Sequence, residues 1–233
     1  KVLLANAVKS FQGSIVLGMG FTFDDTSAEA TSIAEMERLI AKNPKNQERV
    51  FPYIGGSEVN SSSTHAHHRY VINFGEMGEE EAREWPELMK IVEEKVYPER
   101  KKKTGSYSKQ WWLFGRRNQA GQREIATCDR VLVIPRVSQT GALAFLPSEM
   151  VYSEQLIVFA LDTFSAFCSL QSRPHEIWAR FFGSSMKDDL RYTPSDCFET
   201  FPFPTNWETD PTLETIGQTY YQFRADLMVR NNQ

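Results

Sequence analysis

Apolar residues recur along the chain with two spacings, and each spacing predicts one type of element. Short runs of β-branched and aromatic residues predict strands at 69–74, 130–137, 142–146 and 151–161. Apolar residues spaced three and four apart predict helices at 28–42, 78–103, 162–171, 174–182 and 211–230. We therefore expect an α+β fold, in which flanking helices cover a mixed, mostly antiparallel sheet and a C-terminal helix closes the chain.

Polar residues and prolines mark where the predicted helices begin and end. Side-chain oxygens within 24–27 can cap the helix at 28–42, and the Asn-Pro pair that follows ends it. Pro86 should begin a new helix, because proline is tolerated in a first helical turn. Pro98 should interrupt the far end of that helix.

Three other stretches lack a simple spacing. Residues 11–23 mix β-formers with glycines and predict a bent strand or a hairpin. Residues 50–64 contain Pro52, a glycine pair and a run of serines, so we expect a loop. Residues 104–129 are polar, basic and aromatic, and we expect a loop with a short helix at 111–114.

Two predicted helices have a clear apolar side. In the helix at 174–182 this side consists of Ile177, Trp178, Phe181 and Phe182, and we expect it to be buried. The C-terminal helix has an apolar side made by Leu213, Ile216, Tyr220, Phe223 and Leu227. Both helices are therefore predicted to be amphipathic.

The composition is that of a globular protein with a sizeable core. Apolar residues make up 41% of the 233 positions, and no apolar run approaches the roughly 18 residues of a membrane helix. The three cysteines, Cys128, Cys168 and Cys197, are scattered, which argues for reduced thiols in a cytoplasm. Because the chain does not begin with Met, we expect it to be part of a longer protein.

The net charge of −4 conceals a separation of charges along the chain. Residues 76–99 carry nine acids against three bases, whereas residues 100–123 carry eight bases and no acid. Basic side chains can neutralise phosphates, while arginine can read guanine and asparagine or glutamine can read adenine. The basic stretch therefore indicates contact with DNA, and the alternative is a solvated run of charges beside a buried tryptophan pair.

The motifs of several catalytic and cofactor-binding sites are incomplete or absent in the sequence. The Gly18-Met-Gly20 sequence lacks the β-α-β context of a dinucleotide loop. His65, His67 and His68 would need a further ligand to hold a metal, so a metal hydrolase stays a second alternative. Neither an Asn/Asp-Pro-Pro-Tyr/Phe loop nor a glycine-rich methyl-donor motif occurs. We expect no catalysis, no cofactor and no metal site in this chain itself.

A series of motifs in a fixed order is more specific than any one of them. These motifs lie at 10–13, 18–21, 50–56, 65–74, 130–138, 170–185 and 191–204. The series resembles the target-recognition (DNA specificity) domain of single-chain type IIG and IIL restriction-modification enzymes, and of related phage-defence adenine-N6 DNA methyltransferases. By this resemblance, residues 1–204 form the recognition domain and residues 205–233 a helical appendage.

The resemblance implies a function and its partners. Such a domain reads an asymmetric site in double-stranded DNA, so that the methyltransferase domain of the same polypeptide can flip and methylate an adenine. The parent enzyme would use S-adenosylmethionine, and Mg²⁺ if a nuclease is fused to it, in a prokaryotic cytoplasm and without a membrane partner. The alternative within this family is an interdomain scaffold without major base readout.

The resemblance places the recognition residues in variable loops, at about 107–123 and 136–154. We expect base contacts from Arg116, Asn118, Gln122, Arg123, Gln139, Ser148 and Glu149. We expect phosphate contacts from Lys101, Lys103, Lys109, Arg136, Ser138, Arg173 and Lys187.

Overall fold

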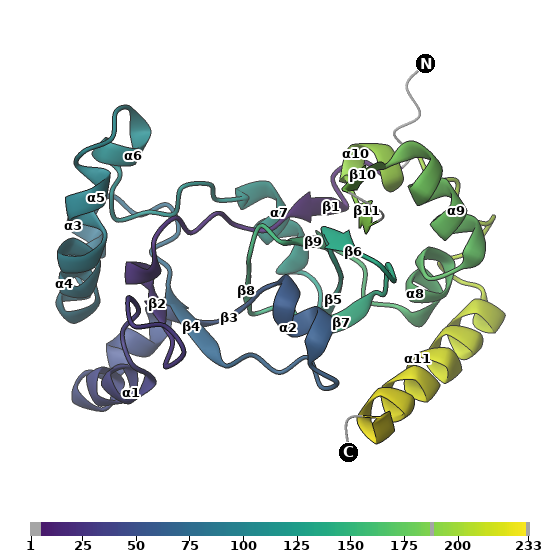
Figure 1. Ribbon diagram of the computed structural model, residues 1–233, viewed down its shortest axis with the longest axis horizontal. Helices are drawn as coiled ribbons and strands as arrows, with labels where there is room; N and C mark the ends of the chain where they lie inside the picture. The colour runs from purple at the N-terminus through teal and green to yellow at the C-terminus, as the bar shows by residue number, and fades with distance from the viewer. Residues whose placement is uncertain (1–5, 187–188, 232–233) are drawn as a thin grey trace.

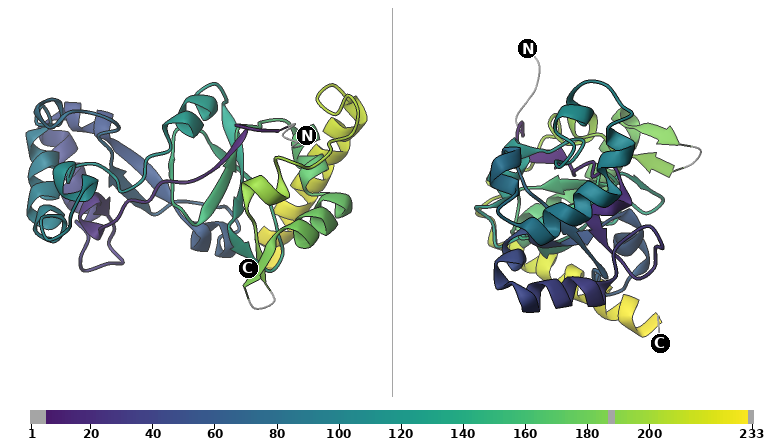
Figure 2. Two further views of the ribbon diagram at one scale, coloured as in Figure 1. Left: turned by 90° about the horizontal axis from the view of Figure 1, so that it is seen from above. Right: turned by 90° about the vertical axis from the view of Figure 1, so that its left-hand side faces the viewer.

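Three small sheets lie along the long axis of the molecule, and helices cover them at both ends (Figure 1). The computed structural model describes residues 6–186 and 189–231. Figure 2 shows the same order from above, with one group of helices at each end and strands between them. Within the described residues, no helix combines the length and the apolar character needed to cross a membrane.

The first sheet has the order β2-β4-β3-β8 and is covered by the acidic helices. Its strands are β2 (Thr22–Phe23), β4 (Arg69–Ile72), β3 (Val50–Ile54) and β8 (Val151–Tyr152), and only the β3–β8 pair is parallel. The surrounding helices are α1 (Ile33–Lys42), η2 (Pro44–Arg49), α3 (Glu79–Ala82), α4 (Pro86–Lys95), α5 (Tyr97–Arg100) and α6 (Ser106–Lys109). Trp85, Trp111 and Trp112 are buried in the cluster beneath them.

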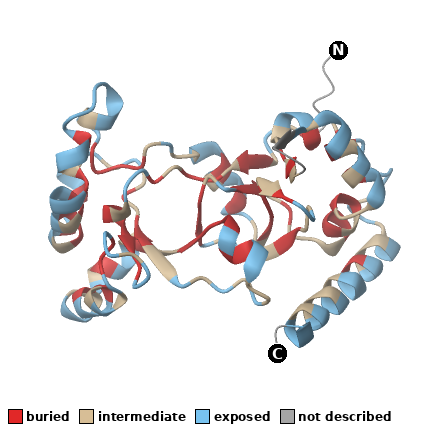
Figure 3. Ribbon diagram, in the orientation of Figure 1, coloured by how far each residue is buried: buried red, intermediate tan, exposed pale blue. Residues whose placement is uncertain are grey.

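The second sheet lies in the middle of the molecule and is buried on both faces (Figure 3). It consists of β1 (Ser10–Gln12), β9 (Leu156–Phe159), β5 (Arg130–Pro135) and β7 (Ala144–Pro147) in that order, all antiparallel. Along β5, Val131 and Val133 face one apolar cluster, whereas Leu132 and Ile134 face another. Because successive side chains point to opposite faces, burial of both faces explains the unbroken apolar run.

Helices pack on each face of the second sheet. The segment α2 (Gly56–Ser61) and helix α7 (Gln119–Ile125) lie on one side. On the other side are α8 (Phe164–Leu170), α9 (Arg173–Phe182) and α10 (Pro194–Cys197). The long helix α11 (Pro211–Asn231) packs against α8. The boundary after residue 204, between the recognition domain and the helical appendage, stays a prediction. Helix α11 packs in the same apolar cluster as residues before that boundary.

The third sheet is a short extension beside α9. It has the order β10-β11-β6, made by β10 (Ser184–Met186), β11 (Asp189–Arg191) and β6 (Val137–Ser138). Its strand pairs are antiparallel, like all pairs of the second sheet. The expected α+β fold with a mixed, mostly antiparallel set of strands and a C-terminal helix is therefore confirmed.

Some local predictions are confirmed and others are wrong. Pro86 begins α4, and Asn43 ends α1 as expected. Ser32 is the N-cap residue of α1, and Asp25 of the predicted 24–27 segment accepts a hydrogen bond from the first N–H of the helix, that of Ile33, at 2.9 Å. The segment 50–64 is not a loop, because it forms β3 and α2. Proline has no N–H to donate to a neighbouring strand. The pairing of β3 with β8 begins only at Tyr53, so Pro52 is not required to donate a hydrogen bond to β8.

Residues 11–23 do not form a hairpin. Their first part, β1, pairs with β9 in the second sheet, whereas their last part, β2, pairs with β4 in the first sheet. The 3₁₀ turn η1 (Met19–Phe21) lies just before β2. The segment 111–114 is a buried turn without helix, and the helices of this region are α6 and α7 instead.

The predicted apolar sides of α9 and α11 mostly do not face the core, although Trp178 of the predicted α9 side is half-buried and packs against the second-sheet cluster. Helix α9 buries His175 and Ala179, which leaves Ile177, Phe181 and Phe182 exposed. Helix α11 buries Gly217 and exposes Ile216, Tyr220, Phe223 and Leu227. A side chain at Gly217 would overlap the carbonyl oxygen of Phe164, so close approach of the two backbones decides which side of α11 is buried.

Candidate nucleic-acid interface

The first residue of the basic stretch has a structural role. The buried Arg100 guanidinium donates hydrogen bonds to the carbonyl oxygens of Leu113 at 2.8 Å and Val16 at 3.0 Å. Burial lowers the pKa of Arg100 from its usual range. Arg100 therefore ties α5 to the 111–114 turn and is not exposed to phosphate, which corrects the interpretation of the whole stretch as a DNA surface.

Residues 116–118 also make internal contacts. The Nε atom of Arg117 lies 2.8 Å from a carboxylate oxygen of Glu76, and Arg116 donates a hydrogen bond to the side chain of Gln12. Asn118 caps α7, because its side-chain oxygen accepts a hydrogen bond from the backbone N–H of Gly121 at 3.1 Å. The base contacts expected of Arg116 and Asn118 stay predictions, but each would compete with these contacts.

The exposed lysines of the basic stretch lie at one end of the molecule. Lys101, Lys103 and Lys109 are exposed at the end of α5 and on α6, in the upper left of Figure 1. Lys101 lies 5.7 Å from the centre of the Tyr97 ring. Helices α3 and α4, which carry six of the nine acids of 76–99, belong to the same group of helices. These lysines are thus separated from the other expected contacts.

Three of the expected base contacts meet in one open cleft. Gln122 of α7 and Ser148 and Glu149 of the β7–β8 turn line a cleft of about 870 Å³. The opposite wall carries Gln47, Arg49 and Asn73, which the sequence analysis did not single out because they become neighbours of Gln122 and Glu149 only in the folded chain. Arg123 is exposed on α7, near the same cleft.

The charge of this cleft does not favour DNA phosphates. Its acids are Asp129 and Glu149, and its only described cation is Arg49, whose guanidinium lies 4.5 Å from the centre of the Trp85 ring. The cleft therefore has amide and carboxylate groups that can form hydrogen bonds with base edges, but little positive charge.

A second hollow lies where β5, β6, α2 and the β8–β9 turn meet. It measures about 390 Å³ and is lined by Gly56, Ser57, Asn60, Pro135, Arg136, Val137, Glu154 and Gln155. The polar residues of this set include a guanidinium group, two amides and a carboxylate. Each of these groups can recognise the edge of a base in the major groove.

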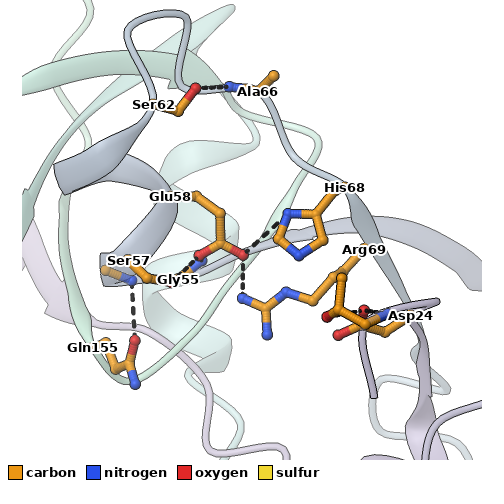
Figure 4. A network of polar contacts seen from close by, with 11 residues as sticks. Asp24, Gly55, Ser57, Glu58, Ser62, Ala66, His68, Arg69 and Gln155 are labelled. Atoms are coloured by element: carbon orange, nitrogen blue, oxygen red, sulfur yellow. Dashed lines mark hydrogen bonds and ion pairs between the residues drawn. The ribbon is translucent and has the colours of Figure 1, made fainter. Parts of the chain in front are cut away.

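A buried carboxylate holds one wall of this hollow in place (Figure 4). Glu58 accepts hydrogen bonds from the Gly55 N–H at 3.2 Å and the Ser57 hydroxyl at 2.7 Å, and it forms an ion pair with Arg69. Gln155 accepts a hydrogen bond from the backbone of α2. Burial alone would raise the pKa of Glu58, but these hydrogen bonds and the charge of Arg69 outweigh it, so the pKa is lowered.

Arg136 lines the hollow, and the pairing of β6 with β11 brings Arg191 next to it. Arg191 lies opposite Val137, so their side chains share one face of the third sheet, and Val137 lines the hollow beside Arg136. The backbone N–H of Tyr192 donates a hydrogen bond to the carbonyl of Arg136 at 2.8 Å. Within 6–186 and 189–231, neither Arg136 nor Arg191 forms an ion pair.

Other expected contacts lie near these arginines. Gln139 is exposed in the loop after β6, and its carbonyl accepts a hydrogen bond from Arg180 at 3.1 Å. Arg173 is exposed but forms an ion pair with Glu176 at 2.7 Å. Ser138 is buried, and its hydroxyl accepts a hydrogen bond from the backbone N–H of Gly141. In this conformation the Ser138 side chain therefore cannot contact a phosphate, contrary to the expectation from the sequence. Lys187 lies outside the described residues.

We use the name β6 face for the hollow together with Arg136, Gln139 and Arg191. It lies between α2 and the third sheet, near the centre and right of the centre of Figure 1. Most of the expected contacts are thus divided among three places, the α5–α6 end, the cleft and the β6 face, whereas Arg116 and Asn118 lie at the start of α7 and Arg173 lies on α9.

The three neighbouring histidines do not converge. His68 lies 3.8 Å from Glu58, His67 packs its ring against Tyr70, and His65 lines a concavity beside α11. Among the residues that the structure describes, no group of three or more His, Cys, Asp or Glu side chains is arranged to hold a metal. The described residues therefore provide no set of metal ligands to support the alternative of a metal hydrolase.

Comparisons with known proteins identify the family. The model of the MmeI target recognition domain family matches residues 1–205. A solved structure of the type IIL restriction-modification enzyme MmeI in complex with DNA shares the fold, with a TM-score of 0.69 and 19% sequence identity. That similarity covers 97% of this chain and 28% of the enzyme chain, whereas the search of curated proteins found no match. The chain belongs to the MmeI target recognition domain family.

Proposed function

We propose that this domain reads a specific sequence in double-stranded DNA and thereby positions an adjoining adenine-N6 methyltransferase. The observation that carries the proposal is the β6 face, where Arg136 and Arg191 adjoin a hollow lined by amides and a carboxylate. Arginine can donate two hydrogen bonds to guanine, amides can pair with adenine, and glutamate can accept from cytosine. The membership of the chain in a target recognition family supports the same function.

Two arginines of the basic stretch are less available to DNA than those of the β6 face, although the lysines of that stretch, Lys101, Lys103 and Lys109, are exposed. Arg100 is buried, and Arg117 is held by Glu76. A guanidinium group that already forms an ion pair must lose that partner before it can bind a phosphate or a base, whereas Arg136 and Arg191 have no such described partner to lose. The hydrogen-bonded wall of the hollow also holds its polar groups in place before DNA binds.

The parent enzyme and its cofactors are part of this proposal. The enzyme similar in fold is more than three times as long, since the similarity covers 28% of it. We propose that the rest of the parent polypeptide carries the methyltransferase, which would bind S-adenosylmethionine, and that any fused nuclease would use Mg²⁺. The recognition chain itself contributes the DNA-reading surface, and a prokaryotic cytoplasm is the expected location.

A selection experiment tests the function directly. The chain is incubated with duplexes that contain a randomised central segment, and the bound duplexes are sequenced. We expect one short motif to be enriched. The affinity for that motif is then measured at about 50 and 200 mM salt, because each phosphate contact contributes about 0.9 to the slope of log affinity against log salt.

Matched variants identify the reading surface. Arg136→Ala/Arg191→Ala should weaken binding and relax the preference at one base or more, by about 1–3 kcal/mol for each lost bidentate contact. Arg38→Ala is the control, because this exposed arginine lies on α1 at the other end and pairs with Glu35. If Lys101→Ala/Lys103→Ala weakens binding instead, the DNA lies at the α5–α6 end. If the wild type enriches no motif, sequence reading by this chain is wrong.

A further inference from the structure

Helix α9 presents an apolar ridge to solvent. The exposed fractions of Ile177, Phe181 and Phe182 are 56%, 78% and 48%. Phe181 and Phe182 lie with ring centres 4.9 Å apart, and Trp178 packs against Phe182 at 4.5 Å. We use the name α9 ridge for Ile177, Phe181 and Phe182. Neighbouring large apolar side chains that stay exposed together mark interaction surfaces more often than single ones do.

The charges of α9 argue against DNA as the partner of this ridge. Arg173 and Arg180 both form ion pairs with Glu176, at 2.7 and 2.9 Å. One carboxylate thus serves both guanidinium groups, so each arginine is already engaged although α9 keeps a net charge of +1. A phosphate backbone would gain little from such a surface, and burial of bare aromatic side chains requires an apolar partner.

The position of the ridge indicates which partner is nearest. Asn6, at the start of the described chain, donates hydrogen bonds to the carbonyl oxygens of Phe198 and Phe201, both at 2.9 Å. Phe201 packs against Trp178 with ring centres 6.0 Å apart, and Trp178 in turn packs against Phe182. A continuous set of contacts therefore joins the N-terminal segment to the ridge. Val8, which is also exposed, belongs to that segment.

We propose that the α9 ridge is the docking surface for the neighbouring domain of the proposed parent polypeptide. This inference rests on the proposed function, in which that domain is the methyltransferase. Its occupant should be an apolar pocket of that domain, because three large uncharged side chains have to be accommodated. A domain tethered beside the ridge binds it with a high effective concentration, so a ridge of modest area is sufficient. Docking here would hold the methyltransferase at one distance from the β6 face, since α9 and β6 adjoin (Figure 1).

Footprinting of aromatic side chains tests the docking without an activity assay. Oxidation rates of Phe181 and Phe182 are compared between the 233-residue chain and the parent polypeptide. We expect at least about fivefold protection in the parent, because a docked aromatic side chain is desolvated. Phe223 on α11 is a matched control, since it is 57% exposed and lies on another helix. Equal rates for Phe181 and Phe182 in both proteins would overturn the proposal.

A pair of variants separates this inference from the proposed function. Phe181→Ser/Phe182→Ser should leave duplex binding by the 233-residue chain unchanged and slow methylation by the parent at least about tenfold, because misplacement of a catalytic domain is costly. Phe223→Ser should change neither. Loss of duplex binding in the double variant would show that the ridge contacts DNA, and a mass of two copies for the wild-type chain that the double variant abolishes would show self-association. Either result would contradict the docking proposal. If the wild-type chain does not bind duplex DNA, the proposed function is contradicted. The docking proposal is then still tested by the oxidation rates of Phe181 and Phe182.

Discussion

The imidazole Nε2 atom of His175 lies 3.1 Å from the hydroxyl oxygen of Tyr192, and both side chains are buried between α9 and the end of β11. The other ring nitrogen contacts the carbonyl oxygen of Leu170. Burial lowers the pKa of His175 to about 4, although hydrogen bonding to backbone groups opposes the shift. His175 is therefore neutral in the folded protein at physiological pH, and this has a consequence for stability.

The free energy of unfolding should decrease as the pH falls below about 6.5. Between this ordinary pKa and the folded value of about 4, the unfolded chain binds a proton at His175 that the folded chain does not. The full effect is on the order of 3 kcal/mol, since one pKa unit corresponds to about 1.4 kcal/mol. Urea unfolding at pH 7, 5.5 and 4.5 measures it. His175→Gln should reduce the dependence of the free energy of unfolding on pH. A smaller dependence should remain, because burial also lowers the pKa of His65.

Arg100→Ala should destabilise the protein without a specific effect on DNA binding. The substitution leaves the buried carbonyl oxygens of Leu113 and Val16 without a donor, and each unsatisfied group costs about 1–3 kcal/mol. Thermal unfolding measures the loss. Lys101→Ala is the control, because this exposed neighbour should change stability little. A stable Arg100→Ala protein that loses duplex affinity would contradict the structural role.

Gly217→Ala should loosen α11 from α8. The added methyl group would overlap the carbonyl oxygen of Phe164, and the two helices would have to move apart. Such overpacking costs about 1–3 kcal/mol. Limited proteolysis measures the exposure of α11, with Thr219→Ala on the exposed side of the same helix as control. Equal protection in both variants would show that the contact is more adaptable than the structure indicates.

Glu58→Gln should weaken both the fold and the β6 face. The amide keeps the shape of the side chain, but it removes the charge that pairs with Arg69 and replaces one acceptor with a donor. We expect a stability loss of about 1–3 kcal/mol, from unfolding in urea. Duplex affinity should decrease as well, because Glu58 holds the start of α2 at the hollow. Glu48→Gln, at an exposed position of η2, is the control.

The sequence was sufficient for the fold class and for most elements whose pattern is local. Strand β4, the start of α4 at Pro86 and the end of α1 at Asn43 depend on neighbouring residues, so a short window contains the necessary information. The ordered motifs also predicted the family that the comparison with residues 1–205 confirmed. The same reasoning failed for 50–64, because β3 is stabilised by its partners β4 and β8 and not by its own residues alone.

The candidate site depended on contacts that are distant in sequence. The charges of 100–123 were evident, but only the folded chain pairs Arg117 with Glu76 and buries Arg100 against Val16. Likewise, Asn60, Arg136 and Gln155 become neighbours in the hollow only because α2, β6 and the β8–β9 turn meet there.

Local sequence was sufficient to predict the period of most helices and strands, the start of α4 at Pro86, the end of α1 at Asn43, and the family. The tertiary structure alone decided which side of each helix is covered, since periodicity places residues on one side without saying what that side meets. In α9 the buried side carries His175 and Ala179, and the more apolar side with Phe181 stays open. The physical reason is that burial is a property of pairs of surfaces, and the second surface comes from elsewhere in the chain.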